Sequence, residues 1–330
     1  MSSEVMIEAR DLVKRYDDVV ALDKVSMEVR RGEVLGFLGP NGAGKSTTMR
    51  ILTCFTSPTE GSAKINGHDV LEESLQAREA IGYLPESNPL YPDLLVLEYL
   101  QFVAEVRGLD KAETRKRLKT IVEETGLGDV YAKQIRTLSK GYRQRVGLAQ
   151  ALIHQPPILI LDEPMSGLDP NQAVEIRDLI KDIGRERTVV LSTHNLAEVQ
   201  VACDRVLIIN KGKIVADDTP DGLRDRAGKT RYLVTVQGEA ADKCESALKA
   251  IDGVERVRGL GAETGELRFE LLPTGSDDLR PRIFKAAVDN DLTLLGLGRE
   301  GQGLEQIFRD LTTSEEAAGA SDSANADAAE

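Results

Sequence analysis

The sequence predicts an α/β domain followed by a small α+β domain, and three observations predict this fold class. Short apolar runs alternate with amphipathic stretches over residues 1–220, as in α/β proteins. A glycine-rich segment at Gly39–Thr47 lies between a buried apolar run and an amphipathic stretch. From Arg231 onward the elements follow the order strand, helix, strand, strand, helix, strand, which is the ferredoxin-like pattern.

The first domain opens with strands and then alternates strands with helices. Val5–Leu12 and Val25–Val29 are predicted to belong to an antiparallel sheet. Glu33–Leu38 is predicted as a buried strand and Lys45–Thr53 as a helix. The segment Val96–Gln134 is charged and has apolar residues at helical spacing, which predicts a helical insertion between two halves of the sheet.

The rest of the first domain follows the same logic. Ile158–Leu161 and Thr188–Ser192 are predicted core strands, because they are short and largely apolar. A helix is predicted between them, from about Gln172 to Ile183. Val206–Asn210 and Lys213–Ala216 are predicted to form a closing hairpin.

The second domain is read from six periodic segments and a polar end. The predicted strands and helices are, in order, Tyr232–Gln237, Ala240–Ile251, Val254–Leu260, Glu266–Leu272, Arg280–Asn290 and Leu292–Leu297. A short helix is predicted over Leu304–Leu311. The last residues have no basic and no aromatic side chain, so we expect them to be disordered. The predicted limits are 1–225, 230–312 and 313–330.

Composition narrows the class of protein. The net charge of −13 over 330 residues argues against a broad nucleic-acid footprint. No apolar run has the length of a membrane span, and the N-terminus lacks the apolar core of a signal peptide, so we expect a cytoplasmic chain. The three cysteines, Cys54, Cys203 and Cys244, are far apart and match no metal-binding pattern. We expect them to be reduced thiols.

The glycine-rich segment fits the phosphate-binding pattern G-x4-G-K-[ST], between a predicted strand and a predicted helix. Glycines let several backbone N–H groups turn toward phosphate oxygens, and the helix N-terminus adds partial positive charge. Lys45 is expected to reach the β- and γ-phosphates and Ser46 to ligate Mg²⁺. A chance glycine turn is the alternative. The candidate ATP-binding residues here are Gly39, Pro40, Asn41, Gly42, Ala43, Gly44, Lys45, Ser46 and Thr47.

Two carboxylates end the strand predicted at Ile158–Leu161. Asp162 is expected to hold Mg²⁺ directly or through water, and Glu163 to act as the general base on the attacking water. A capped turn is the alternative for such a pair. Its combination with the glycine loop favours the catalytic interpretation.

Three further motifs, in a fixed order around Asp162 and Glu163, extend this set. They are Leu138-Ser-Lys-Gly-Tyr-Arg-Gln-Arg145, Ser166-Gly-Leu-Asp169 and His194. From about Met6 to Gly222 the chain resembles the nucleotide-binding subunits of ABC transporters. The resemblance implies a P-loop NTPase with a RecA-like core, an antiparallel β subdomain and a helical signature subdomain.

The resemblance also implies roles for individual residues. Tyr16 is similar to the aromatic residue that stacks on adenine, although a strand-edge tyrosine is the alternative. Ser139 and Gly141 are similar to signature residues that contact the γ-phosphate bound by another subunit. Asp169 is similar to a residue that crosses the dimer interface, and His194 to a switch histidine near the γ-phosphate.

The mechanism that the resemblance implies needs partners. Two subunits, a second copy or a paralogue, are expected to meet head-to-tail around two ATP molecules. A separate integral membrane permease is expected to hold the chain at the inner face of the cell membrane, with no nucleic acid bound. ATP would close the dimer, and hydrolysis would release it.

Some residues depart from the family pattern. Glu86 stands where a glutamine is usual, and is expected to join Ser46 and Asp162 as a Mg²⁺ ligand while adding negative charge. Lys140 and Tyr142 alter the signature, and Lys140 is expected to offset Glu86 across the dimer. The segments around these residues resemble gliding-motility-associated ABC subunits and neighbouring exporter-type ATPases.

The leading functional hypothesis is therefore an ATPase subunit that energises an exporter. An importer ATPase is the nearest alternative, but sugar-importer relatives carry C-terminal barrels rather than a βαββαβ unit. A soluble ABC ATPase acting on ribosomes or DNA is a second alternative, which the single cassette disfavours. A module that binds ATP without turnover is a third, which Glu163 and His194 disfavour.

Overall fold

The computed structural model describes residues 4–226, 231–237, 241–263, 265–275, 277–300 and 308. The chain divides into two compact units, Met1–Pro220 and Asp221–Glu330, and each is described by itself. None of the helices in the described part of the chain combines the length and apolar character needed to cross a membrane. The three cysteines carry free thiols.

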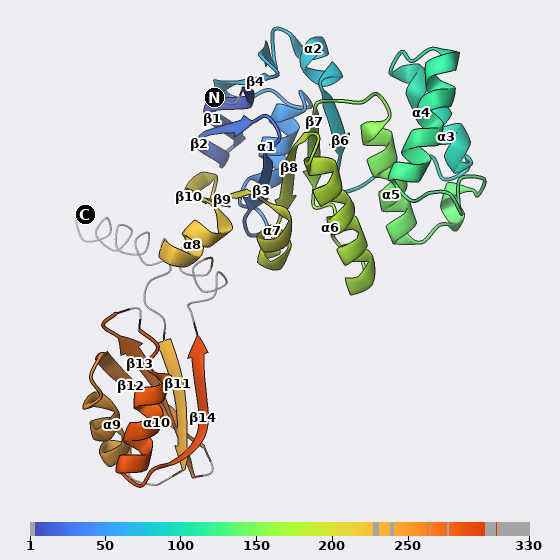
Figure 1. Ribbon diagram of the computed structural model, residues 1–330. Coiled ribbons are helices and arrows are strands. Elements are labelled where there is room, and N and C mark those ends of the chain that lie inside the picture. The colour runs from blue at the N-terminus through green and yellow to red at the C-terminus, as the bar shows by residue number, and fades with distance from the viewer. Residues whose placement is uncertain are drawn as a thin grey trace, which may run out of the picture. The chain divides into compact units, whose positions relative to one another are not determined.

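A six-stranded sheet forms the centre of the first unit, in the order β10-β9-β3-β8-β7-β6 (Figure 1). The strands β9, β3, β8, β7 and β6 run parallel to one another, and β10 pairs antiparallel with β9. Their bounds are β3 Val34–Leu38, β6 Ile81–Leu84, β7 Ile158–Asp162, β8 Thr188–Thr193, β9 Arg205–Asn210 and β10 Lys213–Asp218. The predicted core strands and closing hairpin are thus confirmed.

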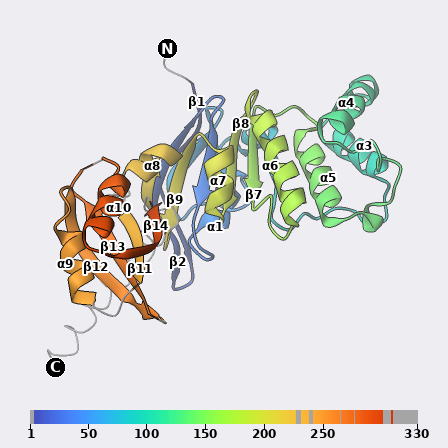
Figure 2. The same cartoon turned by 60° about the horizontal axis from the view of Figure 1, so that its bottom comes forward.

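Successive residues of the central strands face two different cores. In β7, Ile158 and Ile160 pack with α1 (Lys45–Leu52) and the N-terminal strands, whereas Leu159 and Leu161 pack with helices of the opposite layer. That opposite layer holds α5 Lys140–Leu152, α6 Pro170–Gly184 and α7 Leu196–Ala202 (Figure 2). Both faces are covered, which explains why β3, β7 and β8 are buried along their whole length.

The second sheet of this unit has the order β2-β1-β4-β5. Its strands are β1 Val5–Tyr16, β2 Val19–Arg30, β4 Glu60–Ile65 and β5 His68–Asp69, and they pair antiparallel. This confirms the antiparallel sheet predicted from the first two strands, whereas β4 and β5 were not predicted. The first two strands extend beyond their predicted bounds. Register shifts interrupt their pairing, and Asp11 and Lys24 adopt positive φ there. These bulges break the alternation of apolar and polar residues that defines a strand in sequence.

The helix α2 Ser74–Glu79 comes directly before β6, and the helical part of this unit comes after β6. The predicted insertion at Val96–Gln134 contains two helices, α3 Val96–Val106 and α4 Lys111–Glu124. Gly108, with φ of 80°, lies between them. Asp110 caps α4 by accepting from two backbone N–H groups, and Glu113 completes the capping box.

The second unit is a four-stranded sheet in the order β12-β13-β11-β14, with α9 and α10 on one face. The elements are α8 Pro220–Arg226, β11 Arg231–Gln237, α9 Ala241–Lys249, β12 Val254–Glu263, β13 Glu266–Pro273, α10 Arg280–Asp289 and β14 Thr293–Glu300. This order and connectivity confirm the ferredoxin-like prediction. The helix predicted at Leu304–Leu311, apart from Phe308, and the predicted tail 313–330 lie outside the described residues.

The close packing of β6 on α5 yields a stability prediction. A Cβ atom at Gly82 would clash with the carbonyl oxygen of Ala151, which is backbone and cannot move aside. We expect Gly82→Ala to lower the free energy of unfolding in urea by about 1–3 kcal/mol. Gly128→Ala is the control, because nothing lies within 4 Å of the added Cβ there. Equal losses in the two variants would contradict this account of the packing.

Candidate nucleotide-binding site

The phosphate loop joins β3 to α1 and depends on its glycines. Gly42 and Gly44 have φ of 79° and 109°, which favour glycine. An added Cβ would lie 2.7 Å from the carbonyl oxygen of Ala21 at Gly44, and 2.5 Å from that of Ile209 at Gly39. The loop therefore lies directly against neighbouring backbone, and only glycine fits at these two positions.

The first turn of α1 suits an anion. In the described structure no side chain caps this helix, and its first turn contains no acidic residue. Its N–H groups are those that a helix leaves without intrahelical partners. Partial positive charge at this end favours phosphate oxygens.

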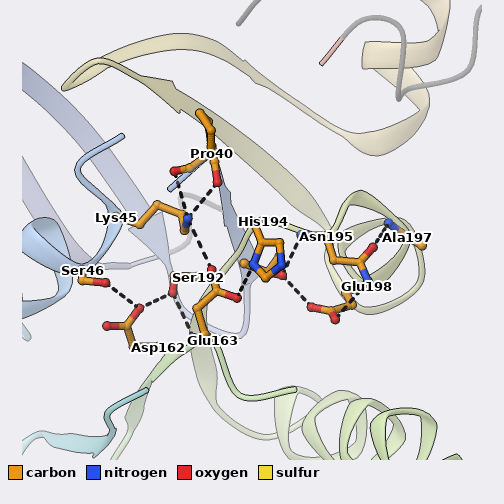
Figure 3. Close-up of polar contacts among 12 residues, drawn as sticks. Pro40, Lys45, Ser46, Asp162, Glu163, Ser192, His194, Asn195, Ala197 and Glu198 are labelled. Atoms are coloured by element: carbon orange, nitrogen blue, oxygen red, sulfur yellow. Dashed lines mark hydrogen bonds and ion pairs between the residues drawn. The ribbon is translucent and has the colours of Figure 1, made fainter. Parts of the chain in front are cut away.

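Lys45 is buried at the start of α1, and its ammonium is held on three sides. Nζ donates to the carbonyl oxygens of Gly39, at 2.7 Å, and Pro40, at 3.2 Å. It also lies 3.3 Å from Oε1 of Glu163, with both side chains less than a tenth exposed. Figure 3 shows this ammonium between the loop and the end of β7. Oxygen atoms of the protein thus contact the Lys45 ammonium, which is the group expected to bind phosphate oxygens.

The two carboxylates at the end of β7 are positioned by β8. Ser192 Oγ donates to Oδ1 of Asp162, and Ser46 Oγ donates to the same atom at 3.3 Å. The backbone N–H of Glu163 donates to the carbonyl oxygen and to Oγ of Ser192, each at 3.1 Å. Glu163 itself has φ of 49°, which is strained for a residue with a Cβ, and these contacts hold it there.

His194 follows β8 and shares Glu163 with Lys45. Its Nδ1 lies 2.8 Å from Oε2 of Glu163, while its ring is about half exposed. Next to it, Thr193 donates through its hydroxyl to Glu198 at 2.6 Å, which fixes the turn before α7. Glu163 therefore bridges a buried lysine and an exposed histidine across the site (Figure 3).

These groups surround one cavity of about 390 Å³. It collects most of the residues predicted from the phosphate loop together with Glu86, Glu163 and His194. Two lining residues had no predicted role in binding, Ala21 and Ser166. The lining residues are Ala21, Pro40, Asn41, Gly42, Gly44, Lys45, Ser46, Thr47, Glu86, Glu163, Ser166 and His194.

Asp162 lies behind Ser46, at the end of β7. Burial raises the pKa of the nearby Tyr83 to about 12, and the charges of Asp162 and Glu86 act in the same direction. The charge of Arg50 acts in the opposite direction, so burial is the main cause of this pKa shift.

Ser192 is the functional residue that sequence reasoning missed. It is fully buried and bonds both to the side chain of Asp162 and to the backbone of Glu163. In the sequence it reads as the end of an apolar strand. The available signal was a hydroxyl residue at the end of a strand next to the one that ends in carboxylates.

Tyr16 is not among the residues that line this cavity. It lies at the end of β1, is 42% exposed, and has the Lys14 ammonium 5.0 Å from its ring centroid. The ring is accessible to a ligand, but the stacking role stays a prediction.

The signature residues lie apart from the cavity. Ser139 and Gly141 line a separate hollow of about 320 Å³ with Gln172 and Glu175. Ser139 caps α5 by accepting from the N–H of Tyr142. In a single chain the structure therefore does not bring the signature to the phosphate loop.

Two other motif residues near that hollow are engaged within the chain. Asp169 caps α6 by accepting from the N–H of Gln172 at 3.0 Å. The Lys140 ammonium lies against Gly167, so close that any Cβ there would clash with it. Lys140 thus rests on the loop Ser166–Asp169 of its own chain.

Comparison with known proteins identifies the family. The family model described as ABC transporter matches residues 22–166, which include the phosphate loop and both carboxylates. The linearmycin resistance ATP-binding protein LnrL of Bacillus subtilis is 31% identical over 309 residues, covering 93% of this chain and 98% of that protein. The chain belongs to the ATP-binding proteins of ABC transporters.

Two more matches support this. The Nod factor export ATP-binding protein I of Cupriavidus pinatubonensis is 36% identical over 221 residues, covering 67% of this chain and 68% of that protein. A dimeric post-hydrolysis structure of the ATP-binding cassette MJ0796, bound to ADP and phosphate, matches with a TM-score of 0.60. It is 27% identical and covers 65% of this chain and 98% of that one.

This ABC protein is accordingly an ATPase whose hydrolysis of ATP energises transport by a separate membrane permease. Subunits of this family dimerise and work with permease partners. The comparisons also confirm the ABC-type fold predicted from the sequence.

The geometry around Glu163 predicts its effect on hydrolysis. Glu163→Gln removes the carboxylate that contacts Lys45 through one oxygen and His194 through the other. We expect the purified chain to lose ATP hydrolysis by about a hundredfold or more, because a general base contributes at least that much. Glu186→Gln, an exposed carboxylate after α6, is the control and should keep its rate. Comparable rates for the two variants would rule out the assigned role of Glu163.

Proposed function

We propose that the chain powers an exporter. The main support is the similarity to LnrL, which is named as a linearmycin resistance protein. This similarity extends over both units of the chain. The second unit is ferredoxin-like, whereas a barrel would favour a sugar importer. The export named in the Nod factor relative points in the same direction.

In the proposed reaction, the binding of ATP changes the contacts of the Lys45 ammonium. The phosphate tail enters over the glycine loop, and its oxygens replace Glu163 as the partner of the Lys45 ammonium. Glu163, freed on that side, takes the proton of the attacking water. His194 stays in contact with Glu163 and orients its carboxylate. Tyr16, exposed at the end of β1, stacks on the adenine base.

The oxygen atoms near α1 suit Mg²⁺. The hydroxyl of Ser46 and the carboxylate of Asp162 lie 3.3 Å apart, and Glu86 lines the same cavity. Hydroxyl, carboxylate and phosphate oxygens are the ligands that this hard cation prefers. When bound, Mg²⁺ neutralises charge that develops on the phosphates. We assign Ser46, Asp162 and Glu86 as the protein side of that site.

A second subunit, either another copy or a paralogue, completes the site in this proposal. The hollow with Ser139 and Gly141 is separate from the phosphate cavity within one chain. A head-to-tail pair would bring the signature of one subunit over the ATP of the other. The loop that holds Asp169 would then lie at the interface.

We assign the permease contact to a cleft between the central sheet and the helical part. It measures about 460 Å³ and is lined by residues of α2, β6 and the ends of α1 and α3. Phe55, Leu75 and Val106 line it and are 77%, 59% and 68% exposed. Exposed apolar groups gathered in one place mark an interaction surface. Binding there places the chain at the inner face of the cell membrane, and the net charge of −13 disfavours nucleic acid.

The direction of transport is tested in inside-out membrane vesicles that carry the chain with its co-purifying permease. A cell extract and ATP are added outside, and the vesicle contents are analysed by mass spectrometry. Export predicts compounds that accumulate inside with the natural chain and not with Glu163→Gln. Compounds lost from preloaded vesicles under the same comparison would instead establish an importer.

The docking assignment predicts a separation of membrane binding from hydrolysis. We expect Phe55→Asp to remove most of the chain from the membrane fraction, because a charge in an apolar contact is costly to desolvate. ATP hydrolysis by the purified variant should stay within about twofold, since Phe55 does not line the ATP cavity. Phe284→Asp, at a similarly exposed phenylalanine of the second unit, is the control. Unchanged membrane recovery of Phe55→Asp would refute the assignment.

A further inference from the structure

Glu86 brings to the phosphate cavity a negative charge that is not paired with a basic side chain in the described part of the chain. It follows β6, is exposed, and lines the cavity with Lys45 and Glu163. Among the described residues, no lysine, arginine or histidine lies within ion-pair distance of its carboxylate. It stands where the family usually has a neutral glutamine.

The basic groups that line the cavity are already engaged. The Lys45 ammonium pairs with Glu163, and the His194 ring contacts the other oxygen of the same carboxylate. Asp162 adds a further negative charge behind Ser46. Once phosphate oxygens replace Glu163 as the partner of Lys45, the Glu86 carboxylate that lines the cavity faces a polyanion. Repulsion between like charges in the same cavity opposes binding of the polyanion.

We propose that Glu86 makes a divalent cation a requirement for ATP binding itself, and not only for hydrolysis. Without the cation, the Glu86 carboxylate repels the triphosphate. With the cation, the same carboxylate becomes a favourable oxygen partner of the metal–nucleotide complex. This inference rests on the proposed assignment of Ser46, Asp162 and Glu86 to Mg²⁺.

The test compares ATP affinity of the full chain in excess EDTA and in excess MgCl₂, by titration with a fluorescent ATP analogue and competition with ATP. We expect wild-type affinity to fall by at least about tenfold in EDTA. Glu86→Gln should bind in EDTA about tenfold more tightly than wild type, and so lose most of the cation dependence. Glu86→Asp should keep it, because it keeps the charge.

A matched control distinguishes the effect of the charge at position 86 from the effect of the net charge of the protein. Glu72→Gln removes a surface carboxylate outside the cavity, and its cation dependence should equal that of wild type. Thermal unfolding of each variant checks that the chain remains folded.

Two results would overturn the inference while leaving the ATPase assignment intact. In the first, wild type and Glu86→Gln both bind Mg–ATP, and the affinity for ATP changes between EDTA and MgCl₂ by the same factor in the two proteins. The other is that Glu86→Gln tightens binding equally with and without the cation, which would mean that the carboxylate repels nucleotide and does not partner the metal. Failure of the wild type to bind Mg–ATP at all would overturn the proposed ATP site as well.

Discussion

The buried ion pair between Lys45 and Glu163 is the interaction on which the rest of the site depends. It joins the phosphate loop after β3 to the carboxylate end of β7, two segments more than a hundred residues apart in the chain. A buried ammonium without a partner is costly, and the loop carbonyls and Glu163 supply its partners. Glycine at position 44 lets the loop pass close enough to its neighbours to make this possible.

In the function proposed above, this arrangement links nucleotide binding to catalysis through a single carboxylate. Because Glu163 contacts Lys45 with one oxygen and His194 with the other, phosphate that displaces it from Lys45 leaves it held only on the His194 side. Ser192 bonds to the side chain of Asp162 and to the backbone of Glu163, and in that proposal it keeps both in place during the exchange. The site therefore has a rigid part, at the ends of β7 and β8, and an exchangeable part at the lysine.

The central sheet and the phosphate loop were predictable from the sequence, because the central strands are short, apolar and bounded by polar motifs. The ferredoxin-like order of the second unit was predictable for the same reason. The full length of β1 and β2 was not, because bulges at Asp11 and Lys24 interrupt the alternation on which the prediction depends. Ser192 was missed because its role arises from the parallel pairing of β7 with β8, which brings together residues distant in the chain.

The separation of the signature hollow from the phosphate loop cannot be read from local sequence patterns, and only the family resemblance suggested it. The resemblance implied that Ser139 and Gly141 contact a nucleotide bound by another subunit, and within one chain they line a hollow separate from the phosphate cavity. Glu86 and Lys140 both depart from the family pattern, and their surroundings are known only from the structure. Glu86 lines the cavity, whereas Lys140 rests on its own chain at Gly167.

The most direct measurement is a double-mutant cycle between Lys45 and Glu163 on the free energy of unfolding of the nucleotide-free chain in urea. Lys45→Met, Glu163→Gln and the combined variant are compared with the wild type. A buried pair that organises the site predicts a coupling of about 1–3 kcal/mol, with the double variant less destabilised than the sum of the single ones. Additive losses, with a coupling near zero, would contradict the central role of this ion pair.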